Sequence, residues 1–146
     1  MIALLQRVST ARVLVDAQPI AAIDQGLLVF VAVEPDDSEM QADRLLQRLL
    51  GYRVFADAGG RMNLSVTDIN GGLLLVPQFT LAADTTRGMR PGFSMAATPD
   101  TGERLFRYLV ERAEQEYSAV GSGRFGADMQ VMLTNDGPVT FWLRTG

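Results

Sequence analysis

Three residue types that often carry out catalysis are missing from this 146-residue sequence: cysteine, histidine and lysine, so that all 13 basic residues are arginine. Without cysteine the chain has no disulfide, no thiolate nucleophile and no cysteine metal ligand. Without histidine it lacks the commonest general base and the commonest metal ligand, and without lysine a Schiff-base mechanism is excluded. An enzyme built from this sequence must work with carboxylates, hydroxyls, amides and backbone groups, and we expect it to need no metal and no cofactor.

Long apolar runs and excess positive charge are also missing. No apolar run approaches the ~20 residues that span a bilayer, and the first residues lack the basic region and cleavage signature of a secretory signal. The formal net charge of −4 argues against a protein that binds nucleic acid over a broad basic face. We therefore expect a cytoplasmic protein that binds neither membrane nor DNA. A local contact with RNA stays open, because residues 85–92 hold Arg87 and Arg90 and no acid; these arginines either bind phosphate or lie solvated in a loop.

The length fits one domain that covers residues 1–146. A helix is predicted over residues 38–51, with a capping box of Ser38 and Gln41 and a left-handed cap at Gly51. A second helix is predicted over 101–117 with Asp100 as its cap, and a turn is indicated at Asp136-Gly137. Apolar periodicity predicts strands over residues 2–8, 11–15, 26–33, 52–55, 72–76, 129–133 and 139–143, and a glycine-rich loop around 121–126. We expect an α+β fold in which two main helices pack against a mixed or antiparallel, barrel-like sheet.

Two segments stand apart from ordinary core or loop. Gln78-Phe79-Thr80 follows the apolar strand at 72–76 almost directly, and Gly137-Pro138 lies between the last two predicted strands. Each segment alone has a structural interpretation. Gln78 and Thr80 fit the polar face of a half-buried strand, and Asp136-Gly137-Pro138 fits a plain hairpin turn.

Taken together, the segments point to a known family. The sequence resembles the D-aminoacyl-tRNA deacylases, also called D-tyrosyl-tRNA deacylases, along nearly its whole length. The matching segments occur in the same order and with the same spacing, which chance does not readily explain. They are Gln6-Arg7-Val8, Gly26-Leu27-Leu28-Val29, Arg61-Met62-Asn63-Leu64-Ser65, Gln78-Phe79-Thr80-Leu81, Arg90-Pro91, Gly123 to Met129 and Asn135 to Thr140.

The resemblance implies a metal-free homodimer that cleaves the ester between a D-amino acid, or glycine, and the terminal adenosine of tRNA. It implies that Gly137-Pro138 is cis, reaches into the partner subunit's pocket and rejects L-amino acids there. It places Gln78, Phe79 and Thr80 around the scissile ester as the catalytic segment. Phe125, Met129 and Arg7 are expected to bind the adenosine and the tRNA end. A dimeric module that binds nucleotides or RNA without turnover is the alternative.

The chain departs from the family pattern at three positions. Pro77 stands where the family usually has serine, and proline offers neither a hydroxyl nor a backbone N–H. Gly92 replaces a serine after Arg-Pro, and Met89 replaces a more polar residue.

An aminoacyl ester is already activated, so positioning and oriented dipoles can suffice for its hydrolysis. The backbone N–H groups of Phe79 and Thr80 are our candidates for stabilising the developing oxyanion. A nucleophilic Thr80 is the competing hypothesis, although no base is visible that would activate it.

Overall fold

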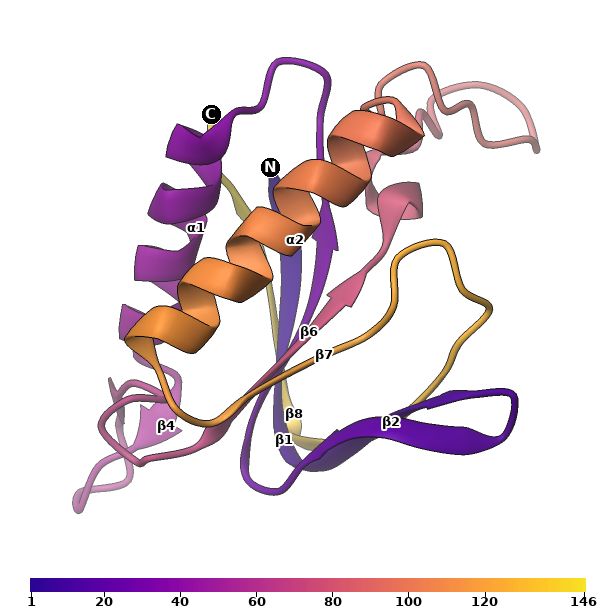
Figure 1. Ribbon diagram of the computed structural model, residues 1–146. Coiled ribbons are helices and arrows are strands. Elements are labelled where there is room, and N and C mark those ends of the chain that lie inside the picture. Colours follow the sequence, from indigo (N-terminus) through magenta and orange to yellow (C-terminus); the bar gives the residue numbers. More distant parts are fainter.

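The computed structural model describes residues 1–146 as one curved, mixed sheet with two helices packed on one face (Figure 1). The strands follow the order β2-β1-β3-β6-β7, and β8 pairs with β1 as well. Strand β1 is antiparallel to β2, β3 and β8, whereas β3–β6 and β6–β7 are parallel. The strands are β1 (Ile2–Val15), β2 (Gln18–Ile23), β3 (Gly26–Ala32), β6 (Gly72–Pro77), β7 (Val120–Ser122) and β8 (Gln130–Arg144). The α+β architecture with a barrel-like sheet and two helices is confirmed.

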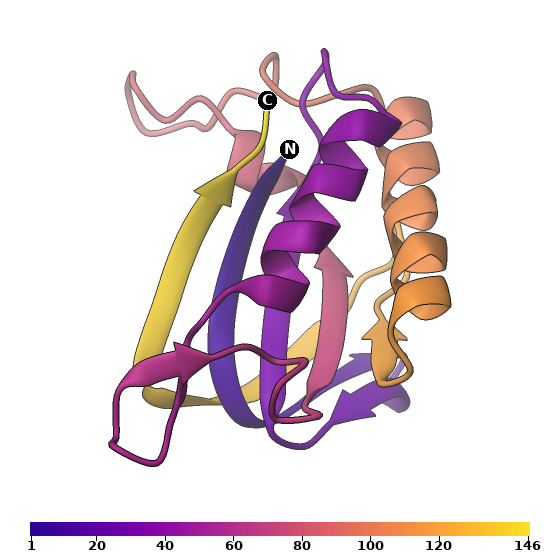
Figure 2. The same cartoon turned by 90° about the vertical axis from the view of Figure 1, so that its left-hand side faces the viewer.

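The two helices, α1 (Glu39–Gly51) and α2 (Pro99–Glu116), lie side by side on the same face of the sheet (Figure 2). Helix α1 begins with the predicted capping box at Ser38. The prediction of a left-handed cap at Gly51 is wrong: Gly51 is the last helical residue, and the chain leaves through an extended Tyr52. The prediction of Asp100 as the cap of α2 is also wrong. Thr98 caps this helix and accepts the N–H of Thr101 at 3.4 Å, because Pro99 favours the first helical position, where no N–H is needed.

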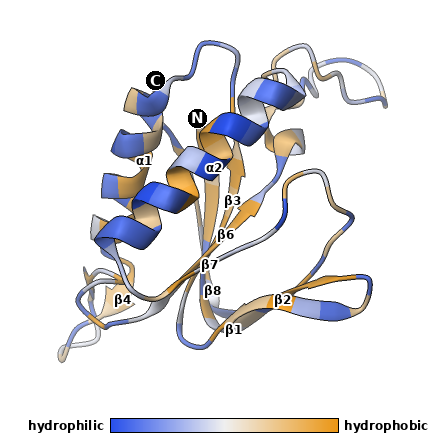
Figure 3. Cartoon of the chain, viewed as in Figure 1, coloured by the Kyte–Doolittle hydropathy of each residue, from blue (hydrophilic) through white to orange (hydrophobic).

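Apolar side chains form cores on both faces of the sheet. The larger core lies between the sheet and the helices, and contains the inward faces of both helices with Leu5, Leu27 and Leu75. Figure 3 shows the resulting pattern, with apolar strands and helices that turn their polar sides outward. A smaller core lies on the opposite face, where β2 and parts of β1 and β8 curl over β3 and β6; its buried members are Val8, Ala11, Val13, Leu28, Leu74 and Val76. Strand β3 is thus covered on both faces, which explains its continuous apolar run.

Two pairs of predicted strands are single strands in the structure. Residues 2–8 and 11–15 form one strand, β1, because both halves pair with β8. Residues 129–133 and 139–143 likewise belong to one strand, β8, and the predicted turn at Asp136-Gly137 is wrong. Gln6 pairs with Thr140 and Val8 pairs with Asn135, so that residues 136–139 form a bulge opposite Arg7. Both halves of β8 run in the same direction, which a hairpin turn does not allow.

The other differences concern short elements. The strand predicted at 52–55 is reduced to β4 (Phe55–Ala56), which pairs with β5 (Met62–Leu64), and part of the glycine-rich loop at 121–126 is strand β7. Strand β2 was not predicted. The four-residue 3-10 helix η1 (Phe79–Ala82) was not predicted either. No helix has the length and apolar composition needed to cross a membrane.

Candidate active site

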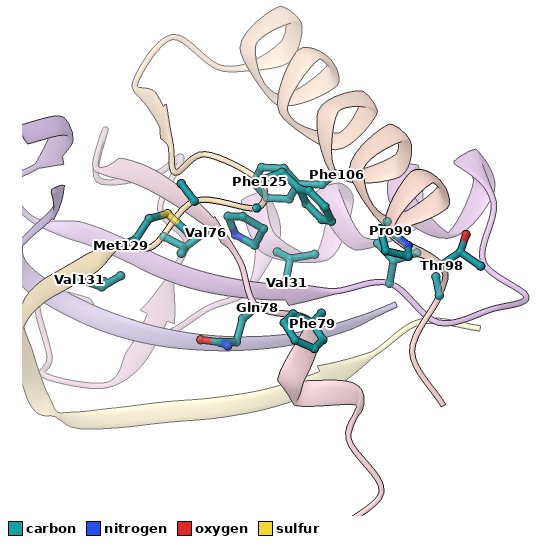
Figure 4. Close-up of a pocket in the computed structure, with 16 residues that line it drawn as sticks. Val31, Val76, Gln78, Phe79, Thr98, Pro99, Phe106, Phe125, Met129 and Val131 are labelled. Atoms are coloured by element: carbon teal, nitrogen blue, oxygen red, sulfur yellow. The ribbon is translucent and has the colours of Figure 1, made fainter. Parts of the chain in front are cut away.

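A cavity of about 470 Å³ opens where β3 and β6 end (Figure 4). Its size falls within the range of small-ligand sites. Val31 and Val76 form part of its floor, the start of α2 forms one wall, and the segment from Phe125 to Val131 forms another. Of its 16 lining residues 10 are hydrophobic, and none has a titratable side chain. Acid–base catalysis by a side chain therefore has no candidate within the lining of this cavity.

The turn from β6 into η1, next to the cavity, leaves two backbone donors without a partner. The N–H of Gln78 still belongs to the sheet and donates to the carbonyl of Val31 at 2.8 Å, and the carbonyl of Gln78 accepts the N–H of Leu81 at 3.2 Å. The N–H groups of Phe79 and Thr80, at the start of the helix, donate to no protein acceptor. They provide two adjacent, unpaired donors beside the rim.

The side chains of this turn are placed differently from one another. Gln78 and Phe79 line the cavity, whereas Thr80 is absent from its lining. The Thr80 hydroxyl lies 2.5 Å from Nε2 of Gln78, which donates to it. An amide is not a base, so the neighbour of this hydroxyl cannot remove its proton. The structure therefore gives the hydroxyl a donor that fixes its position and no group that would make it a nucleophile.

The wall opposite this turn contains the two side chains expected to bind adenosine. Phe125 and Met129 both line the cavity. Two glycines make room for them: a Cβ on Gly102 of α2 would lie 3.3 Å from Cζ of Phe125, and one on Gly123 would lie 2.9 Å from Sδ of Met129. The sequence had marked Gly123 as part of a family segment and of a glycine-rich loop, whereas Gly102 was not singled out. A glycine in the first turn of a helix, where alanine is preferred, was the available signal for Gly102.

Gly137 and Pro138 lie outside this cavity, in the bulge of β8. Their peptide bond is cis, as the resemblance implied. Arg7 lies beside them rather than at the cavity: its Nε donates to the carbonyl of Asp136 at 3.0 Å and its Nη1 donates to the carbonyl of Val54 at 2.8 Å. The side chain of Asn135 accepts the N–H of Val139 at 3.0 Å and so closes the bulge from within. Within this chain Arg7 therefore ties the bulge to the backbone at Val54.

The cavity and the bulge are far apart within one chain. Val8 pairs with Gly26 at the start of β3 on one side and with Asn135, beside the bulge, on the other. The bulge lies opposite Arg7, which pairs with Leu27, and the cavity begins at Val31, four residues further along β3, or about 13 Å of extended strand. Of the residues predicted to form the site, the structure brings together Gln78, Phe79, Phe125 and Met129 at the cavity. Thr80 lies beside Gln78 but outside the lining, and Gly137, Pro138 and Arg7 lie elsewhere.

Carboxylates do not gather at the cavity or anywhere else in the chain. No group of three or more Asp or Glu side chains is positioned to hold a metal ion. Asp84, beyond η1, has its pKa lowered because its carboxylate accepts hydrogen bonds from the side chain and the backbone N–H of Thr86. These hydrogen bonds favour the ionised carboxylate, so Asp84 does not offer a general acid.

Comparisons with known proteins place the whole chain among known sequences and folds. The family model of the D-Tyr-tRNA(Tyr) deacylases matches residues 4–144. A D-aminoacyl-tRNA deacylase of Pseudomonas fluorescens strain Pf0-1 is 65% identical over 97% of this chain and 98% of its own length. The one from Janthinobacterium sp. strain Marseille is 59% identical over 99% and 97% of the two chains.

Solved structures share the fold. One described as a c-Myc DNA unwinding element binding protein superimposes with a TM-score of 0.95 at 34% identity, and covers 100% of this chain and 99% of its own. Another, a probable eukaryotic D-amino acid tRNA deacylase, has a TM-score of 0.85 at 16% identity over 97% of both chains. At that identity, the likeness concerns the fold.

Proposed function

Because this chain belongs to the D-Tyr-tRNA(Tyr) deacylase family, we propose that it is a hydrolase of D-aminoacyl-tRNA. Water attacks the carbonyl carbon of the ester, the bond to the ribose oxygen breaks, and the products are a free D-amino acid and tRNA. The match of the family model to residues 4–144 is the observation that carries this proposal. Charged tRNA is a cytoplasmic substrate, so we place the reaction in the cytoplasm.

The absence of titratable side chains from the cavity lining supports a mechanism based on positioning. The ester is already activated, and the apolar walls exclude bulk water and hold the terminal adenosine between Phe125 and Met129. The unpaired N–H groups of Phe79 and Thr80 stabilise the oxyanion that develops on the ester carbonyl. One such donor contributes about 10²–10³ in rate. Gln78 holds Thr80 in place through its 2.5 Å hydrogen bond, and Thr80 has no chemical step of its own.

A second copy of the chain completes the site. Gly137 and Pro138 do not reach the cavity of their own chain, because the bulge that holds them lies about 13 Å of strand away from it, on another strand of the sheet. Residues 136–138 of the bulge are exposed, so a second molecule can reach them, and the hydrogen bond from Arg7 to the carbonyl of Asp136 holds the bulge in place. We assign these residues to the cavity of the partner in a homodimer.

In this arrangement Gly137 and Pro138 select the D-enantiomer by exclusion. Their carbonyls accept hydrogen bonds from the substrate ammonium group while the ester is held at η1. With both groups held, the two enantiomers direct their side chains oppositely, and the L side chain meets the Gly-Pro backbone. Rejection by a clash requires no pocket fitted to each D side chain. Glycine has no side chain to reject and is cleaved as well.

Loss of ester from D-tyrosyl-tRNA, compared with L-tyrosyl-tRNA, tests the proposal directly. We expect turnover of the D-ester that persists after exhaustive chelation with EDTA. Stoichiometric binding of the D-ester without hydrolysis would instead support a binding module. A rate that collapses with EDTA and returns with zinc or magnesium would contradict the positioning mechanism.

A further inference from the structure

A short hairpin that bears two arginines stands at the rim of the cavity. It leaves the end of η1, projects from the body of the protein beyond the start of α2, and returns to Thr98 (Figure 1). Its base is closed by two hydrogen bonds between Asp84 and Gly92, of 2.7 and 2.9 Å. Both flanks continue into walls of the cavity, namely η1 and the start of α2. We call residues 84–93 the rim hairpin.

An exposed aromatic pair joins the rim hairpin to the cavity. The rings of Phe79 and Phe93 lie 5.2 Å apart between centroids and are tilted by 57°. Phe79 lines the cavity, yet 55% of it is exposed, and Phe93 is 44% exposed. Aromatic rings that remain this exposed beside a pocket are typical of a surface that contacts a ligand. The two rings offer apolar faces to the part of a bound ligand that extends out of the cavity at this rim.

The rim hairpin is locally positive although the chain carries a net charge of −4. Arg87 and Arg90 are exposed, and neither forms a salt bridge. The one carboxylate of the hairpin, on Asp84, is occupied by hydrogen bonds from the N–H and hydroxyl of Thr86, at 3.0 and 2.6 Å. Both guanidinium groups are therefore available to an anion, and phosphate is the anion that their planar forks fit best.

We propose that the rim hairpin binds the single-stranded 3′ end of tRNA just before the terminal adenosine. The pair of Phe79 and Phe93 stacks on the base that precedes the adenosine, and Arg87 and Arg90 contact the adjoining phosphates. Stacking on aromatic rings together with cationic contacts to the backbone is the usual way in which proteins hold single-stranded nucleic acid. This inference rests on the proposed function, since it extends the same substrate outward from the cavity.

Two substrates distinguish the contribution of the rim hairpin from that of the cavity. D-tyrosyl-tRNA reaches both, whereas the small ester D-tyrosyl-adenosine occupies the cavity alone. For the double variant Arg87→Ala/Arg90→Ala we expect KM for D-tyrosyl-tRNA to rise about tenfold, with kcat and the hydrolysis of D-tyrosyl-adenosine unchanged. Two phosphate contacts to a single strand also contribute about 1.4 to the slope of log(kcat/KM) against log of the salt concentration, and the variant loses this contribution. Phe93→Leu removes the stacking ring and should raise KM for the tRNA at least about fivefold. Phe93→Tyr keeps an aromatic ring and should leave KM near the wild-type value.

A matched control keeps the interpretation specific. Arg44→Ala/Arg107→Ala removes two charges as well, from exposed positions on α1 and α2 that form no salt bridge, and should leave both substrates unaffected. Equal effects of the two double variants on tRNA would overturn the proposal, because general attraction would then explain them. Unchanged kinetics of the hairpin variants on tRNA would overturn it as well, and would leave a protein partner as the hairpin's ligand. If the wild-type protein hydrolyses neither ester, the proposed function itself fails.

Discussion

Replacement of Gly137 by alanine should damage the bulge of β8. Gly137 has φ +140°, a backbone conformation that L-residues rarely adopt. A Cβ at this position would lie 2.7 Å from Cγ2 of Val139, 2.9 Å from the backbone N of Val139 and 3.2 Å from Nη2 of Arg7. The side chains can move aside, but the backbone N cannot move without breaking its hydrogen bond to Asn135.

The magnitude follows from these contacts. The unfavourable φ costs about 1–3 kcal/mol, and the broken hydrogen bond adds about 0.5–1.5 kcal/mol. We expect Gly137→Ala to lower the free energy of unfolding by about 2–4 kcal/mol, a large share of the ~5–15 kcal/mol that stabilises a typical domain. Urea denaturation measures this loss. Gly126→Ala is the control, because Gly126 has φ +77° and no atom near a new Cβ, so it should lose only about 1–2 kcal/mol.

The same substitution should change enantiomer selection. If the bulge positions the carbonyls that sort D from L substrates, its displacement lowers the rate on D-tyrosyl-tRNA and raises the relative rate on L-tyrosyl-tRNA. The ratio of the two rates is measured with both esters, at a temperature at which urea denaturation shows that the variant is folded. If Gly137→Ala lowers the free energy of unfolding as expected but leaves the ratio of L to D rates unchanged, the bulge has no role in selection. If the free energy of unfolding is unchanged, the contacts and the backbone conformation at Gly137 do not have the cost that we assign to them.

Three further predictions concern the fold and its response to pH. Gly26→Ala should cost more than about 3 kcal/mol, because its Cβ would overlap the carbonyl oxygen of Gly72 in the adjoining parallel strand and push β3 from β6; a melting temperature equal to the wild type's would contradict this. Ala17→Gly should stabilise the protein by about 1 kcal/mol in urea denaturation, since Ala17 has φ +61° in the turn between β1 and β2, and a loss of stability would show that its methyl group packs favourably. The pKa of Asp57 is lowered, chiefly because its carboxylate accepts a hydrogen bond from the side chain of Asn63. The resulting stability is therefore present above the unfolded pKa, near 4, and is lost as pH falls through the lower folded value; Asp57→Asn should remove this loss in an acid titration, and an identical acid transition would contradict it.

Much of the architecture could be read from local sequence patterns. The capping box at Ser38, the apolar run of β3 and the helical spacing of α2 each depend on neighbouring residues, so they appeared where expected. The resemblance also supplied the four residues that meet at the cavity. The missing types, cysteine, histidine and lysine, already indicated a site without the usual catalytic side chains, and the cavity lining has no titratable group.

The errors came where pairing between distant segments overrides local preference. Asp136-Gly137 has the composition of a hairpin turn, but pairing with β1 on both sides makes it a bulge in one strand. Gly51 sits where a cap glycine is common, but the chain leaves α1 in an extended conformation toward β4. The surroundings of Arg7 likewise depend on distant segments. The resemblance implied a tRNA contact for its guanidinium, and only the fold places Asp136 and Val54 within its reach.

The sequence by itself determined the chemistry that is available, the elements of the fold and the family, because these depend on residue types and on their order along the chain. Only the tertiary structure decided which of the residues meet. Gln78 and Phe125 are 47 positions apart and line one cavity, since parallel pairing and the packing of α2 bring the ends of their segments together. Gly137 is kept away from that cavity by its register with β1, although the same family pattern contains both. Register and packing are properties of long-range contacts, which no local stretch of sequence encodes.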